Sequence, residues 1–343
     1  MRDIRDRLRS ASDPTVTVLP DGSVDRRSAV VDVEGNLLSR ETVGHEIAGD
    51  GKTFLTEWHG VEPGGQSVNA ARQVHALGAK TTLVGHLDHP IFEGLSFRTY
   101  SMGEPAEIHV YELADGVTMF AAESTDIATW TFERFTSTVG PDAASLFAAD
   151  VLLWANWAAF PHGTGAITRL LEELPDDGTV VIDPGAVSTR PERDMVAFLD
   201  ALGSTPFEGE VVLSPNQREA TLLAEALDAT TGGPSESAIE LREYADIDAV
   251  AIHGRRKATV ATRNDHVEVP TVEDVTPSRH AGAGDRFSAA VAYGLALDWA
   301  WDEILTLGNA CATHYIVHGR SGDREDLQAI DAEYGRDERT RTE

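Results

Sequence analysis

Short apolar runs alternate with helical stretches along most of this chain. The runs lie at residues 15–20, 81–87, 150–155, 179–185, 210–216 and 249–254, and amphipathic stretches lie at 67–78, 163–174, 191–203 and 217–228. This alternation is typical of crossover units, which build a mostly parallel sheet with helices on both faces. The sequence therefore predicts a doubly wound α/β fold that binds its ligands at the carboxyl ends of the strands.

Two regions depart from this alternation, because residues 29–62 and 106–123 show strand patterns without intervening helices. Turns at Glu34-Gly35 and Asp115-Gly116 divide each region into a hairpin. We expect the hairpins to pair as a small antiparallel β lid over the larger sheet, or to form edge hairpins with no moving part. Because exposed strand edges favour pairing with a second copy, we also expect a homodimer through the lid.

The charge balance limits the partners of the chain. It has 57 acidic against 28 basic residues in 343, a formal charge of −29. Such a surface repels nucleic acid and anionic membranes, so neither is expected as a partner. The acidic excess is spread along the chain, which suggests a halophilic origin, where salt screens the repulsion. Charges throughout residues 1–13 leave no apolar signal core, so we expect a cytoplasmic protein.

A Gly-Ala-Gly-Asp turn precedes an apolar helical run. Gly282, Ala283 and Gly284 carry little side chain, so an anion can approach the free backbone N–H groups and the positive end of the helix. Asp285 therefore places a negative charge at the position where an anion would bind. It is either a cap of the helix or a base that acts on a group beside the anion.

Asn216 and Glu219 lie three residues apart at a predicted strand-to-helix junction. This spacing places an amide and a carboxylate on one face of the first helical turn, which suits a hydrated Mg²⁺ beside polyphosphate. The same spacing is also that of a capping box, with Asn216 as N-cap and Glu219 at the third helical position.

Two further motifs offer partners for hydroxyl groups. Gly64 and Gly65 precede Asn69 at another helix opening, where glycine lets the backbone approach a ligand and an amide both donates and accepts. Asp25 follows the first predicted strand and can accept from a pair of sugar hydroxyls, although a turn with Asp and Gly is also simply a turn.

Taken in order, these motifs resemble those of the ribokinase-like sugar kinases, the PfkB-type carbohydrate kinase family. The matching positions are Gly22 to Asp25, then Gly64, Gly65 and Asn69, then Asn216 and Glu219, and finally Gly282 to Asp285. The resemblance covers residues 15–320 and implies one kinase domain, flanked by flexible tails at 1–14 and 331–343. It also implies ATP and Mg²⁺, with a hydroxyl of a small sugar or sugar derivative as the phosphoryl acceptor.

The resemblance assigns roles position by position. Asp285 becomes the base, and Gly282, Ala283 and Gly284 form the anion hole for the γ-phosphoryl group. The residues expected to bind the sugar are Asp25, Gly64, Gly65 and Asn69. Those expected to bind Mg²⁺ are Asn216 and Glu219, and those expected to bind the nucleotide are Asn216, Gly254, Lys257 and Asn309. A nucleoside kinase of the same fold, or a sugar- or nucleotide-binding protein that has lost catalysis, remains as an alternative.

The chain departs from the family pattern just before the final turn. Arg279 and His280 stand where the family usually has an aspartate and a threonine, the former helping to bind a monovalent cation. A guanidinium has only donors and cannot ligate K⁺. Our hypothesis is that Arg279 supplies the positive charge itself, so that turnover does not depend on K⁺.

Overall fold

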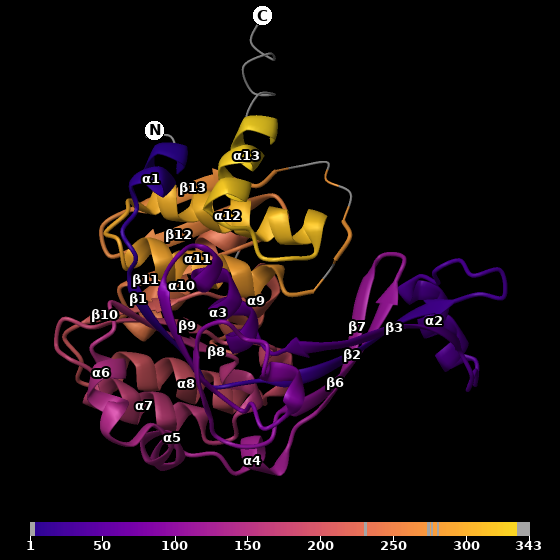
Figure 1. Cartoon of the computed structure of the whole chain (residues 1–343), viewed down its shortest axis with the longest axis horizontal. Coiled ribbons are helices and arrows are strands. Elements are labelled where there is room, and N and C mark those ends of the chain that lie inside the picture. Colours follow the sequence, from indigo (N-terminus) through magenta and orange to yellow (C-terminus); the bar gives the residue numbers. More distant parts are fainter. Residues whose placement is uncertain (1–3, 230–231, 273–274, 276, 280, 335–343) are drawn as a thin grey trace, which may run out of the picture.

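A computed structural model describes residues 4–229, 232–272, 275, 277–279 and 281–334 (Figure 1). The described strands include a nine-stranded sheet in the order β13-β12-β11-β10-β9-β8-β1-β4-β5. All neighbours from β5 to β11 pair in parallel, and β12 and β13 add an antiparallel edge. In chain order the strands are β1 (Thr15–Leu19), β4 (Lys80–Gly85), β5 (Arg98–Ser101), β8 (Val151–Ala155), β9 (Thr179–Asp183), β10 (Glu210–Leu213), β11 (Ala249–Ile252), β12 (Lys257–Thr262) and β13 (His266–Pro270). The predicted doubly wound, mostly parallel sheet is confirmed.

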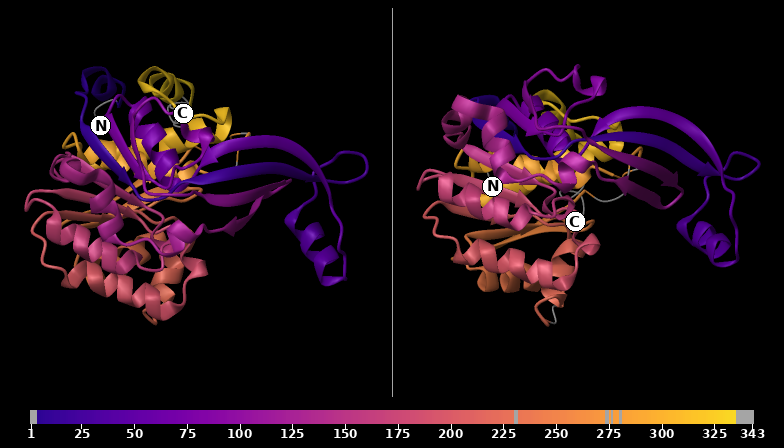
Figure 2. Two further views of the ribbon diagram at one scale, coloured as in Figure 1. Left: turned by 60° about the horizontal axis from the view of Figure 1, so that its bottom comes forward. Right: turned by 90° about the horizontal axis from the view of Figure 1, so that it is seen from below.

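The central strands are apolar throughout because both faces of the sheet are covered. Along β8, Leu152 and Trp154 face one core while Val151 and Leu153 face the other. One core is covered by α1 (Ile4–Ser10), α3 (Gln66–Ala76), α11 (Ala283–Leu295), α12 (Trp301–His318) and α13 (Arg324–Tyr334). The other is covered by α5 (Phe132–Val139), α7 (Gly163–Glu173), α8 (Glu192–Ser204), α9 (Gln217–Glu225) and α10 (Pro234–Ala245). In the left view of Figure 2 the yellow helices α11 to α13 lie above the sheet, and the magenta-to-orange helices of the other set lie below it.

Short elements complete the connections between these layers. They are η1 (Pro90–Phe92), α4 (Thr125–Ala128), η2 (Gly140–Asp142), α6 (Ala143–Phe147), η3 (Trp157–Ala159) and η4 (Val187–Thr189). Among the described residues, no helix is both long and apolar enough to cross a bilayer.

A second sheet forms an arm that projects from the body (Figure 2). Its order is β3 (Leu55–Gly64), β2 (Ser23–Val31), β6 (Ala106–Leu113) and β7 (Gly116–Ala122). The β2–β3 and β6–β7 pairs are antiparallel as predicted, but β2 and β6 pair in parallel. The reason lies in the connections: β2 follows β1 and β6 follows β5, and β1 and β5 leave the same edge of the large sheet. We call this second sheet, with its connections, the lid arm.

A helix that the strand pattern does not predict interrupts residues 29–62. Helix α2 (Arg40–Ala48) lies between β2 and β3, and the side chain of Ser39 accepts from the backbone N–H of Thr42 to cap it. Within this fully described helix no residue is buried, so the apolar periodicity that marks helices of the body is missing. Its Ser-x-x-Thr start is the local signal that could have located it.

The amino-terminal segment also differs from the expected flexible tail at 1–14. Helix α1 forms there because Ile4 and Leu8 are buried in the core, and Arg7 donates to Glu303 at 2.8 Å. At the other end, α13 continues to Tyr334, so part of the expected tail from residue 331 is helical. Residues 335–343 lie outside the described part of the chain.

Candidate active site

The Gly-Ala-Gly-Asp turn opens helix α11 beside a cavity of about 2020 Å³, and all four of its residues line that cavity. Gly282 is the N-cap residue with φ +92°, a left-handed conformation that favours glycine. A Cβ on Gly284 would lie 2.7 Å from Cε1 of His253. These two constraints favour glycine at both positions, so no large side chain precedes Asp285 at the start of α11.

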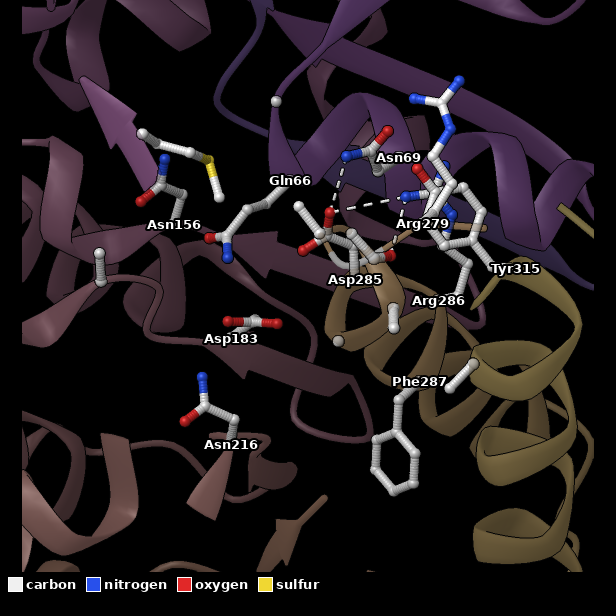
Figure 3. A pocket seen from close by; sticks show the side chains of 18 of the residues that line it. Gln66, Asn69, Asn156, Asp183, Asn216, Arg279, Asp285, Arg286, Phe287 and Tyr315 are labelled. Atoms are coloured by element: carbon white, nitrogen blue, oxygen red, sulfur yellow. Dashed lines mark hydrogen bonds and ion pairs between the residues drawn. The ribbon is translucent and has the colours of Figure 1, made fainter. Parts of the chain in front are cut away.

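Asp285 lies in the first turn of α11 and is only 7% exposed. Its Oδ2 accepts from Nδ2 of Asn69 at 2.7 Å and lies 3.7 Å from Nη1 of Arg286 (Figure 3). Burial raises the pKa of Asp285 to about 6, while Arg286 and the Asn69 hydrogen bond act in the opposite direction. The carboxyl group is thus ionised near neutral pH and poised to accept a proton.

Three glycines and Asp25 meet where β1, the lid arm and α3 join. Ser23 donates to Oδ1 of Asp25 at 2.5 Å, and burial raises the pKa of Asp25. A Cβ on Gly64 would collide with this carboxylate, and one on Gly65 would lie 2.8 Å from Cα of Gly22. Asp25, Gly65 and Asn69 line the cavity, whereas Gly64 is buried and makes room for Asp25.

Asn216 and Glu219 form a capping box at the start of α9. Oδ1 of Asn216 accepts from the N–H of Glu219 at 3.0 Å, and Oε2 of Glu219 accepts from the N–H of Asn216 at 2.8 Å. The alternative interpretation of this spacing is therefore present in the structure, and both residues also line the cavity. Burial, followed by the charge of Asp183, raises the pKa of Glu219 well above its usual range.

Two buried carboxylates were missed by the sequence reasoning. Asp183, the last residue of β9, is 3% exposed, accepts from Oγ of Ser288 at 2.8 Å, and has its pKa raised to about 7 by burial and by Asp285. Asp21 accepts from the N–H groups of Gln66 at 3.0 Å and Ser67 at 2.6 Å, which fixes the start of α3. A carboxylate at the end of a buried strand was the available signal for both.

The carboxylates that line the cavity suit a hydrated divalent cation better than a metal ion bound by protein groups alone. The charge of Asp285 raises the pKa of both Asp183 and Glu219, and the charge of Asp183 also raises that of Glu219; a nearby cation would relieve this repulsion. Within the described ranges, no group of three or more His, Cys, Asp or Glu side chains is arranged to hold a metal alone. Mg²⁺ keeps several waters and binds through one or two carboxylates together with substrate phosphates.

The residues assigned to the nucleotide divide into two groups. Gly254 and Asn309 line the cavity, and Nδ2 of Asn309 donates to the carbonyl of Pro270 at 3.1 Å. Lys257 instead points to the edge of the sheet, where its Nζ lies 2.5 Å from Oε1 of Glu268. In the part of the chain that is described, Arg255 and Arg256 are the basic residues of this loop that line the cavity. The structure does not bring Lys257 to the site.

Arg279, three residues before Gly282, links the Gly-Ala-Gly-Asp turn to the lid arm. Its Nη1 and Nη2 donate to the two carboxylate oxygens of Glu62 on β3, at 3.0 Å and 2.7 Å. Such a bidentate pair fixes both side chains. His280, the other departure from the family pattern, lies outside the described residues.

A doubly wound body, a β arm at the carboxyl ends of its strands, and a glycine turn beside a buried carboxylate are the features that the resemblance to ribokinase-like kinases predicts. The chain belongs to the prokaryotic ketohexokinase family, whose model matches residues 40–334. It is 26% identical over 297 residues to a ketohexokinase of Haloferax volcanii, covering 81% of this chain and 78% of the relative. The chain is therefore a phosphotransferase that catalyses the ATP-dependent phosphorylation of a sugar.

Solved structures confirm the fold. Arabidopsis thaliana ribokinase complexed with ribose and ATP superposes with a TM-score of 0.67 at 18% identity, covering 93% of this chain and 99% of that one. Adenosine kinase from Sinorhizobium meliloti gives a TM-score of 0.68 at 18% identity, covering 94% and 99%. Because a sugar kinase and a nucleoside kinase match equally well, the fold alone does not choose the acceptor.

Proposed function

We propose that the protein transfers the γ-phosphoryl group of ATP, with Mg²⁺, to a hydroxyl of a ketohexose. Membership of the ketohexokinase family and the named haloarchaeal relative support the ketohexose as acceptor. The observation that carries the chemistry is the contact between Asp285 and Asn69, which joins the phosphate turn to the predicted sugar side of one cavity.

In the proposed reaction, the carboxylate of Asp285 takes the proton of the sugar hydroxyl as its oxygen bonds to the γ-phosphorus. The bond from that phosphorus to the β,γ-bridging oxygen breaks, and ADP leaves. The backbone N–H groups of Gly282 to Gly284 stabilise the negative charge on the transferring group, which is the main demand of phosphoryl transfer. Asn69 orients Asp285 and keeps its own Oδ1 available to a hydroxyl, and the carboxylate of Asp25 accepts from another.

Asn216 and Glu219 are proposed to hold Mg²⁺ through water beside the phosphates, consistent with their position on the cavity wall. When bound, the ion supplies positive charge to the polyphosphate. The nucleotide is proposed to lie along Gly254 and Asn309, with Arg255 and Arg256 in place of Lys257 as the cations within reach of its phosphates.

A substrate panel tests the proposal. ADP release is measured with ATP and Mg²⁺ against fructose, aldohexoses, ribose, fructose 6-phosphate and adenosine, and the product with the best acceptor is identified by NMR. We expect a ketohexose to give the highest kcat/KM. Preference for adenosine would identify a nucleoside kinase, and binding of sugar or ATP without ADP release would identify a protein that has lost catalysis.

The Asp285→Asn variant tests the base, with Asp302→Asn as its control. Asp302 occupies the first turn of α12, so this control removes a carboxylate from a comparable helix start outside the cavity. We expect Asp285→Asn to bind the sugar yet lose about 10²-fold or more in kcat, the range of general base catalysis. Ordinary turnover of Asp285→Asn would refute the assignment.

We further propose a homodimer formed through the lid arm. Among the described residues, ten large apolar side chains are exposed, and eight of them lie on the arm: Val33, Leu37, Ile47, Leu55, Trp58, Val61, Met119 and Phe120. An apolar concentration of this kind favours a protein partner, and a second copy offers the same surface to itself. Light scattering of Trp58→Asp against wild type tests this, with a shift from dimer to monomer expected.

The acidic surface and the haloarchaeal relative support a halophilic enzyme. Its use of ATP supports work in the cytoplasm. Both statements are tested together by activity in cell extract and by the salt dependence of the melting temperature, which we expect to rise with molar KCl because the screening of 57 acidic residues reduces their repulsion.

A further inference from the structure

Arg286 follows Asp285 in α11 and is almost fully buried, with 3% of its surface exposed. Its Nη1 donates to the carbonyl of Gly282 at 2.8 Å and lies 3.7 Å from Oδ2 of Asp285. The guanidinium carbon stands 3.8 Å from the centre of the Tyr315 ring on α12 (Figure 3). One cation is thus fixed between the turn, the carboxylate and an aromatic face.

Burial of this guanidinium lowers the stability of the fold unless other groups compensate its charge. A guanidinium taken out of water loses hydration, and here Nε is buried without a hydrogen-bond partner among the described residues. The stacking on Tyr315 and the bond to Gly282 recover part of that loss. The remaining partner is the carboxylate of Asp285, which is itself buried.

We propose that Arg286 is a positioning residue of the phosphoryl-transfer site, which fixes the shape of the Gly282 turn and holds Asp285 as a carboxylate ready to accept a proton. A Cβ on Gly282 would lie 2.6 Å from Nη1 of Arg286, so this position of the guanidinium requires a glycine at residue 282. The inference rests on the proposed function, because it requires Asp285 to be the base.

The charges around Asp285 explain why such a cation is needed. Asp21 after β1 and Asp25 on β2 oppose the ionisation of Asp285. The charge of Asp285 in turn raises the pKa of two further carboxylates, Asp183 at the end of β9 and Glu219 on α9. Asn69 on α3 contributes a neutral donor. Among the described groups, Arg286 is the nearest cation to Asp285, and its charge favours the ionised form.

The test compares the pH dependence of kcat/KM in Arg286→Gln, Arg286→Lys and wild type. Loss of an opposite charge at this distance raises the pKa of a carboxyl group by about one unit or more. We therefore expect the acid limb of Arg286→Gln to move to higher pH by about one unit, with a lower plateau above it because glutamine cannot hold the Gly282 carbonyl and stack on Tyr315 together. Arg286→Lys keeps the charge and should leave the limb near that of wild type, with lower activity because it cannot hold the Gly282 carbonyl and stack on Tyr315 together.

Arg324→Gln is the matched control, because Arg324 also binds carbonyls, those of Leu77 and Ala11, and lies over Tyr293 of the same helix α11 outside the cavity. We expect it to lower the melting temperature and leave the acid limb unchanged. An equal loss of activity at every pH in both Arg286 variants would overturn the inference and leave Arg286 a structural residue. Normal activity of Asp285→Asn would instead refute the proposed function, so the two failures are distinguishable.

Discussion

Asn69 and Asp285 are 216 positions apart in the chain, yet their side chains meet in a hydrogen bond of 2.7 Å between Nδ2 and Oδ2. The bond joins the first turn of α3 to the first turn of α11, two helices that pack side by side on the same face of the sheet. It therefore brings the predicted sugar side and the predicted phosphate side of the cavity to a common point.

Replacing Asn69 with Ala should weaken both sides at once. The variant loses a donor to a buried carboxylate and a partner for a sugar hydroxyl, and hydrogen bonds to charged groups contribute about 1.5–3 kcal/mol each. We expect kcat/KM for the sugar to fall by about 10- to 100-fold, measured by ADP release. Asn264→Ala, at the exposed turn between β12 and β13, is the control and should keep full activity. A fall confined to the KM for ATP would contradict this placement.

The pKa of Asp285 predicts opposite effects of one substitution on activity and stability. The group ionises near 6 in the folded protein and at its ordinary value of 3.8 when unfolded. The folded state binds the proton more tightly, so this group stabilises the fold at low pH and that contribution is lost as the pH rises through about 4 to 6. At pH 7 the charge costs stability, on the order of 2–3 kcal/mol.

Asp285→Asn should therefore unfold at higher urea concentration than wild type at pH 7, with the difference shrinking toward pH 4. Urea titrations at the two pH values measure it. An asparagine variant that is less stable than wild type at pH 7 would show that the ionised carboxylate is well compensated by Arg286 and Asn69. The wild-type kcat/KM should fall as the pH drops below about 6, because only the ionised carboxylate accepts a proton.

The close approach of His253 to Gly284 allows a test of the proposed anion hole. An alanine there would bring Cβ to 2.7 Å from the ring of His253, so either the ring or the turn must shift. Because misplaced oxyanion donors cost about 10²- to 10³-fold in kcat, we expect Gly284→Ala to lose activity on that scale. Gly165→Ala on α7 is the control, since nothing lies within 4 Å of its Cβ. Unchanged turnover in Gly284→Ala would remove the turn from the mechanism.

The sequence predicted the parts of this protein that depend on local pattern. Buried strands such as Val151–Ala155 show as apolar runs, and the Gly-Ala-Gly-Asp turn shows as a loss of side chains before a helix. It could not reveal that β2 and β6 pair in parallel, because register between distant strands depends on where each leaves the body. Nor could it place Lys257, since a strand-edge lysine and a phosphate-binding lysine have the same local sequence, and only the pair with Glu268 decides between them.

Asp183 illustrates the same limit within the site. It ends a buried strand in a sequence that also fits an ordinary turn, and its importance comes from Ser288, 105 positions away, and from the charge of Asp285. The local sequence of Arg286 likewise indicates no more than a residue within a helix. Both are recognised only once the burial and the neighbours of the side chain are known. A charged side chain indicates a role in the site where its burial is energetically unfavourable.

The pair of Arg279 with Glu62 predicts how the enzyme responds to monovalent cations. In the ribokinase-like pattern that the sequence resembles, an aspartate that helps to bind such a cation usually stands at the position of Arg279, whereas here a guanidinium donates to Glu62 at 3.0 Å and 2.7 Å. A donor-only side chain cannot ligate K⁺, so its permanent charge should take over that role. We expect equal turnover in KCl and NaCl at matched ionic strength. Glu62→Gln should lower turnover in both salts by loosening Arg279, while loss of activity in NaCl and recovery with KCl would show that K⁺ still binds.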